Sequence, residues 1–127
     1  MKRDFLLCLV IVGLAVFLSF GHAVAQNKVP IVIGAVQPLT GWAALGGKNV
    51  VAGMKIALER IKSSGGILGR PFELVIEDGK AEPIESVNAI EKLLHRDKVP
   101  AIIGCWASSA TLAAMPIMQR NKIPLLV

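Results

Sequence analysis

The chain has 127 residues, and its 14 lysines and arginines outnumber its nine aspartates and glutamates, so the net charge is +5. The basic residues are scattered and only 5% of the residues are aromatic, which argues against a nucleic-acid-binding surface, and we expect no nucleic-acid partner. The length suffices for one small domain with a single hydrophobic core.

The first 25 residues have the layout of an export signal. A charged start, Met1 to Arg3, precedes an apolar run over residues 5–20 and the small-residue site Ala23-Val24-Ala25. We expect cleavage after Ala25 and a periplasmic or otherwise extracytoplasmic protein that starts at Gln26. The alternative is an uncleaved membrane anchor, because the apolar run approaches the ~20 residues of a spanning helix. The Ala-x-Ala ending favours cleavage.

From residue 26 onward, short apolar runs alternate with segments of helical period. This order is typical of β-α-β units, and it predicts an α/β fold with a parallel, doubly wound sheet and right-handed crossovers. The predicted strands are residues 29–36, 72–76, 100–104 and 124–127, and the predicted helices are residues 48–64, 84–96 and 108–121.

Local signals support these elements. The first run is almost continuously apolar, as in a strand that is buried on both faces. Gly65-Gly66 ends the first helix, Pro83 suits the start of the second, and Pro116 is expected to interrupt or kink the third. The apolar faces expected on the first two helices are Val50, Val51, Met54, Ala57, Leu58 and Ile61, and Ile84, Val87, Ile90, Leu93 and Leu94.

Two further features concern the whole chain. Cleavage of the signal would remove Cys8 and leave Cys105 as a single free cysteine, which we expect to be buried as a small core residue. Residues 123–127 are all apolar and read as a strand that has just begun. We therefore expect a truncated chain.

In an open parallel sheet, ligands bind in the loops that follow the carboxyl ends of the strands. Three loops qualify: residues 38–47, 77–82 and 104–109. The first is rich in glycine and carries Trp42, which no core pattern explains. The second is acidic, but Glu77 and Asp78 are adjacent on a strand end and should point to opposite faces, which does not suit joint acid-base chemistry.

The third loop is the most informative. Ser108 and Ser109 stand at a helix start, where unpaired N–H groups and the positive end of the helix dipole suit a carboxylate. Simple capping is the alternative for these serines. Trp106 is either a partly buried core residue or a wall of a pocket that packs on a ligand side chain.

Enzyme signatures fail in turn. Residues 41–49 resemble a P-loop, but Lys48 comes one residue late and Asn49 replaces the hydroxyl residue that would hold magnesium. His22 lies in the export signal and His95 late in an exposed helix, so neither offers a base for serine or cysteine chemistry. Metal-ligand spacing is absent. We expect no enzyme, no metal and no cofactor.

The order of motifs resembles the leucine/isoleucine/valine-binding protein family, the extracytoplasmic substrate-binding components of branched-chain amino acid ABC transporters. The resemblance covers essentially all of residues 26–127. It is carried by IVIGAVQPLTG at 31–41, Gly53, Ile61, GGILGRP at 65–71, VIED at 75–78, Pro83, IIG at 102–104, and Ser108-Ser109.

The resemblance implies that residues 26–127 form the N-terminal, incomplete lobe of a type I periplasmic binding protein fold, which closes on a ligand and delivers it to a membrane permease. It implies that Ser108 holds the α-carboxylate of an amino acid or a related amide or carboxylate, with help from Ala107 and Ser109. Many members carry a tyrosine where this chain has Gly46-Gly47, and Trp42 and Trp106 are expected to compensate. The resemblance also implies a second lobe and a hinge, which we expect to be absent from residues 26–127.

Two other functions stay open at this point. The same fold serves as the ligand-binding domain of sensory receptors, and a transmembrane helix with a kinase after residue 127 would indicate sensing. A truncated gene product that binds nothing is the third hypothesis. The residues do not identify the ligand.

Overall fold

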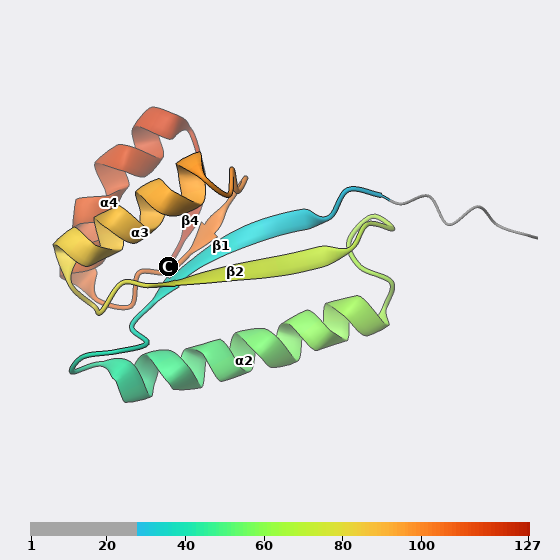
Figure 1. Cartoon of the computed structure of the whole chain (residues 1–127), viewed down its shortest axis with the longest axis horizontal. Helices are drawn as coiled ribbons and strands as arrows, with labels where there is room; N and C mark the ends of the chain where they lie inside the picture. The colour runs from blue at the N-terminus through green and yellow to red at the C-terminus, as the bar shows by residue number, and fades with distance from the viewer. Residues whose placement is uncertain (1–27) are drawn as a thin grey trace, which may run out of the picture.

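The computed structural model describes residues 28–127, so the predicted export signal and its cleavage site lie outside the described residues. Strands and helices alternate as predicted (Figure 1). The elements are β1 (Ile31–Gln37), α2 (Ala44–Ser63), β2 (Phe72–Asp78), α3 (Pro83–His95), β3 (Ile102–Ile103), α4 (Ser108–Asn121) and β4 (Leu125–Leu126).

The four strands form one parallel sheet in the order β2-β1-β3-β4, which confirms the predicted fold class. β1 and β2 pair along their full length, from Ile31 opposite Phe72 to Gln37 opposite Asp78. β3 and β4 are shorter than predicted. Pro100 and Pro124 lack the N–H that a ladder needs, and Gly104 leaves the extended region at φ +118. Because every pair is parallel, all carboxyl ends lie at one edge.

The two faces of the sheet are covered unequally. α3 and α4 pack together on one face, and α2 lies alone on the other (Figure 1). The main core lies on the α3 and α4 side, and its best buried members are Val36, Ile90, Leu93, Val99, Ile102, Ala110 and Ala114. Ile90 and Leu93 confirm the predicted face of α3, but Ile84 is 76% exposed and does not belong to it.

On the other face, α2 contacts the sheet through part of the predicted stripe. Val51 is buried, whereas Met54, Leu58 and Ile61 are half-buried. Val50 and Ala57 were expected in this stripe and are exposed. Their positions lie to the side of the contact line, which follows Val51 at intervals of three and four residues.

The predicted start of α2 is wrong by four residues, because the helix begins at Ala44 and includes Gly46 and Gly47. Glycine disfavours helices, so the sequence predicts a loop for this pair. The structure gives the reason for a glycine at position 47: a Cβ there would overlap the carbonyl oxygen of Pro38. The loop after β1 is therefore pressed against the first turn of α2.

The other helix boundaries agree closely with prediction. Pro83 occupies the first turn of α3, and Gly65 and Gly66 follow α2 with φ of +91 and +83, as expected for a left-handed end. α4 spans residues 108–121 and continues through Pro116, so the predicted interruption does not occur. None of the helices within residues 28–127 is both long and apolar enough to cross a membrane.

Candidate functional site

The carboxyl edge of the sheet brings three loops together. β1 lies between β2 and β3, so the loop over residues 38–43 stands between the loops over residues 79–82 and 104–107. The Gly79 N–H donates to the Gln37 carbonyl oxygen at 3.1 Å, and a Cβ on Gly104 would overlap the carbonyl oxygen of Val36. The backbones of these loops are therefore in close contact.

Asp78 clamps the first two loops to each other. Its Oδ1 accepts from the N–H groups of Leu39 and Lys80, both at 2.9 Å, and its Oδ2 accepts from the Thr40 hydroxyl at 2.5 Å. Partial burial acts to raise the pKa of this carboxyl, but the hydrogen bonds, led by that from Thr40, outweigh it and hold the pKa below its ordinary value. Asp78 is thus a charged clamp whose oxygens are already occupied.

The Glu77 side chain lies on the face of the sheet opposite to that of Asp78, as predicted for adjacent residues of a strand. It pairs with Lys92 at 2.7 Å and with Arg96 at 2.9 Å, both near the end of α3. The prediction did not find the clamp made by Asp78. A signal existed, because an aspartate that precedes a turn often accepts the N–H two residues further on, here that of Lys80.

The start of α4 offers unpaired donors. Ala107 occupies the N-cap position without a side-chain cap, and the first helical hydrogen bond shown runs from the Thr111 N–H to the Ala107 carbonyl at 3.0 Å. Ser108 and Ser109 are exposed, and within residues 28–127 their hydroxyls bond to no other side chain or backbone group. The capping role considered for these serines is therefore not the observed one.

A short network holds the loop that leads into α4. The Thr111 hydroxyl donates to the carbonyl oxygens of Cys105 and Ala107, at 3.1 Å each. Cys105 is free and buried, which confirms the prediction for it. Burial raises the pKa of its thiol against a smaller opposing effect of Ser86, so the thiol is neutral at pH 7 and acts as a packing residue.

The two tryptophans meet at this edge. The rings of Trp42 and Trp106 lie edge to face, with centroids 5.5 Å apart and planes at 73°. Trp106 is 43% exposed, so it is not a core residue. Trp106 also rests on the first turn of α2, because a Cβ on Gly46 would lie 2.9 Å from its Cζ2 atom. The aromatic pair therefore joins the first loop, the third loop and α2.

The buried side-chain amide of Gln37, near this edge, was not predicted. Gln37 ends β1 and is 4% exposed, and its Oε1 atom has no hydrogen-bond partner among the described residues. Its Nε2 atom lies 3.1 Å from the position that a Cβ on Gly104 would take. Strand periodicity reveals which way such a side chain points but not whether its amide is satisfied.

The chemistry of this edge suits binding of an anion with an apolar group. Neither α2 nor α4 has an acidic residue in its first turn, so the positive ends of both helix dipoles are uncompensated from within the helix. His95 pairs with Glu91 at 2.8 Å and lies in the last turn of α3, at the end of this helix that is away from the loop over residues 79–82. Within residues 28–127 no three potential metal-ligating side chains cluster.

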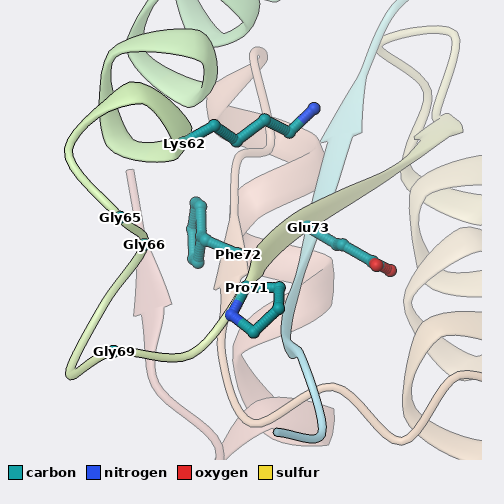
Figure 2. Close-up of a pocket in the computed structure, with 7 residues that line it drawn as sticks. All are labelled: Lys62, Gly65, Gly66, Gly69, Pro71, Phe72 and Glu73. Atoms are coloured by element: carbon teal, nitrogen blue, oxygen red, sulfur yellow. The ribbon is translucent and has the colours of Figure 1, made fainter. Parts of the chain in front are cut away.

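A cavity of about 640 Å³ lies at the opposite, amino edge of the sheet (Figure 2). It is surrounded by the turn that joins α2 to β2 and by the start of β2. Its lining residues are Lys62, Gly65, Gly66, Gly69, Pro71, Phe72 and Glu73. None of the predicted ligand-binding residues belongs to it.

Comparisons with known proteins identify the family of the chain. A sequence model of the family described as "Periplasmic binding protein" matches residues 30–127. An amino acid binding protein of Pseudomonas aeruginosa is 36% identical over 102 residues, which are 80% of this chain and 26% of the relative. Several other relatives are Leu/Ile/Val-binding proteins or their homologues.

Solved structures indicate the same family. The isoleucine complex of the branched-chain amino acid transporter substrate binding protein LivJ from Streptococcus pneumoniae has a TM-score of 0.73 and 32% identity, covering 76% of this chain and 28% of that one. A solute binding protein from Rhodopseudomonas palustris in complex with 3,4-dihydroxybenzoic acid has a TM-score of 0.68 and 29% identity, covering 76% and 26%.

The chain thus spans about a quarter of the length of these relatives, in their N-terminal portion. The predicted resemblance is confirmed, and with it the expectation of a binding protein in place of an enzyme. By its sequence and by the fold of residues 28–127, this chain belongs to the periplasmic binding protein family.

Proposed function

We propose that residues 26–127 are the N-terminal ligand-binding lobe of an extracytoplasmic substrate-binding protein, which carries a branched-chain or related amino acid to the membrane permease of an ABC importer. Residues 1–25 are its cleavable export signal in this proposal. The observation that carries it is the start of α4, where Ser108 and Ser109 present free hydroxyls beside unpaired backbone N–H groups.

This helix start suits the carboxylate that all amino acids share. The N–H groups of Ser108 and Ser109 precede the first helical hydrogen bond, and two hydroxyls add to them. Hydrogen bonds to a charged group are about twice as strong as neutral ones, and the positive end of the helix dipole adds to the attraction. Trp106, two residues earlier in the chain and in contact with Trp42, is assigned in this proposal to pack on the apolar side chain of the ligand.

The relatives support the remaining parts of the proposal. The family is one of periplasmic binding proteins, and the LivJ relative holds isoleucine. Because this chain spans 28% of that relative, we assign closure over the ligand and recognition of the amino group to a second lobe of the whole protein. The transporter role printed for the LivJ relative supports delivery to a permease.

Titration with leucine, isoleucine and valine tests the proposed ligand class. Both tryptophans of the chain lie at the site and there is no tyrosine, so intrinsic fluorescence reports on this edge alone. We expect Ser108→Ala to weaken binding roughly tenfold, the effect of one lost hydrogen bond to a charged group. Ser64→Ala is the matched control, because its hydroxyl bonds only to carbonyls at the far end of α2. Failure of all three amino acids to bind would refute branched-chain amino acids as the ligand class.

Recovery of the exported protein tests the signal. Expression in a Gram-negative host, followed by osmotic shock and N-terminal sequencing, should yield a soluble chain that begins at Gln26. A chain that keeps Met1 and stays in the membrane fraction would show that residues 1–25 act as an anchor.

A further inference from the structure

Two exposed indoles face each other at the carboxyl edge of the sheet. Trp42 is 71% exposed and Trp106 is 43% exposed, although tryptophan is highly buried on average in folded proteins. Their edge-to-face contact, at 5.5 Å between centroids, leaves much of both rings open to solvent. An aromatic pair of this kind offers apolar area with a defined geometry to a third ring.

Gly46 makes this arrangement sterically allowed. A Cβ on Gly46 would approach three atoms of the Trp106 indole, Cζ2 at 2.9 Å, Cε2 at 3.2 Å and Nε1 at 3.3 Å. Gly53, in the same helix, has nothing within 4 Å of its Cβ position. The indole therefore lies directly on the backbone of the first turn of α2, in the space that a side chain at position 46 would take.

The ring pair and the start of α4 are continuous along the chain. Trp106 directly precedes the N-cap residue Ala107, and the exposed Ser108 follows, so the indole and the donors that suit a carboxylate belong to one short segment of the chain. A ligand whose carboxylate binds there would place the group attached to it near the indoles. Flat rings gain from offset or edge-to-face contact with indole, in addition to the area that they bury, whereas branched aliphatic groups gain from area alone.

We propose that the Trp42–Trp106 pair, held in place by Gly46, makes this site select a carboxylate that carries a flat aromatic ring over one that carries an aliphatic group. This inference rests on the proposed function, because it takes the start of α4 as the carboxylate site. It adds the substrate class and names Gly46 and Trp106 as the residues that determine it. Aromatic amino acids and benzoate-like acids share this chemistry.

Two matched ligand pairs, measured by calorimetry on the 127-residue chain, test the proposal. Phenylalanine against leucine compares a ring with a branched chain on the same amino acid backbone. Benzoate against cyclohexanecarboxylate compares a flat ring with a saturated one without an amino group. We expect the flat member of at least one pair to bind about three- to tenfold more tightly, and the pair that shows this distinguishes the two ligand sources.

Three variants connect this preference to the residues. Trp106→Leu and Gly46→Ala should bring the ratio within a pair close to one, the first by removal of the ring and the second by displacement of it. Gly53→Ala should keep the ratio of the unaltered chain. Near-ultraviolet circular dichroism provides a readout without ligand: the signal of the coupled indoles should fall in Gly46→Ala and persist in Gly53→Ala. Trp42→Leu, at the more exposed ring, should halve or abolish the preference with little risk to folding.

The outcomes distinguish failure of this inference from failure of the proposed function. Leucine binding as tightly as phenylalanine, together with parity of the two ring acids, overturns the aromatic preference and leaves the amino acid site standing. A preference that survives Trp106→Leu or Gly46→Ala overturns the assignment to these residues. Absence of binding for all four ligands overturns the proposed function and the inference together.

Discussion

The two edges of the sheet differ in their main feature: one has a cavity, and the other has hydrogen-bond donors and exposed indoles. The amino edge has the cavity of about 640 Å³ (Figure 2). Three of its lining residues, Gly65, Gly66 and Gly69, have no side chain that could fill it. The carboxyl edge has directed chemistry: the start of α4 with unpaired N–H groups and two serines, and two indoles in contact.

Concavity and binding chemistry therefore need not coincide in this molecule. The charged groups that line the cavity are Lys62 and Glu73, and Lys62 already pairs with Glu59 at 3.1 Å. At the carboxyl edge the donors converge because three parallel strands end there, which is a property of the topology.

The largest effect is expected from Gly104→Ala at the carboxyl edge. Gly104 has φ +118, which other residues avoid, and a Cβ would overlap the Val36 carbonyl oxygen. We expect the free energy of unfolding to fall by about 3 kcal/mol or more, as judged from denaturant titration. Gly53→Ala is the control, and it should be neutral or slightly stabilising because its surroundings are open. Equal stability of the two variants would contradict this role of Gly104.

The second effect concerns the clamp made by Asp78. Replacement by alanine leaves the N–H groups of Leu39 and Lys80 and the Thr40 hydroxyl without their acceptor, and should cost about 2 kcal/mol at pH 7. Circular dichroism with urea measures this loss. If Asp78→Ala lowers the free energy of unfolding by less than the substitution of an exposed serine does, the two loops are held together by other contacts.

The pH dependence of the same clamp gives a separate prediction. The pKa of Asp78 is lower in the folded chain than its ordinary value of 3.8, so the unfolded chain binds the proton more readily. The stabilisation is therefore fully present above about pH 4 and is lost as the pH falls through the lowered folded pKa. Asp78→Asn cannot titrate, so the stability difference between it and the unaltered chain should shrink below about pH 4. A constant difference from pH 7 to pH 2 would refute the assignment.

Most of the fold was predictable, because the spacing of the hydrophobic residues and the positions of the turn residues indicate its helices and strands. Residues 108–121 were predicted as a helix with the bounds observed, since Ser108 and Asn121 enclose a helical pattern. The start of α2 was not, because Gly46 and Gly47 are in the helix for reasons of close approach to Trp106 and Pro38. A single sequence shows the helix propensity of each residue, but it does not show which residues far along the chain will contact it in the folded structure.

The candidate site was predictable in its position and not in its contacts. The rule for parallel sheets placed Ser108, Trp106 and Trp42 at one edge, and the indole contact agrees with it. The clamp from Asp78 to Thr40 spans 38 positions of the chain, and the unbonded Oε1 of Gln37 depends on packing. Both follow from the tertiary structure, which local patterns do not encode.

A smaller effect is expected from Thr111→Val, which keeps the side-chain shape and removes the hydroxyl. That hydroxyl bonds to the carbonyls of Cys105 and Ala107, so its loss should cost about 1 kcal/mol and loosen the loop that carries Trp106. Thermal unfolding measures the first effect, and the mobility of the indole, from fluorescence anisotropy, measures the second. Unchanged anisotropy would indicate that Gly46 alone positions the ring.

The smallest effect is expected at the amino edge, from Lys62→Met. The Lys62 ammonium is exposed and its pair with Glu59 is a surface ion pair, so we expect a change in stability within about 0.5 kcal/mol. If the carboxyl edge is the binding site, ligand affinity should also stay unchanged, although Lys62 lines the cavity. A clear loss of affinity in Lys62→Met, with Ser108→Ala left intact in binding, would move the site to the amino edge. Because the two variants lie at opposite ends of the strands, one titration of each decides between the edges.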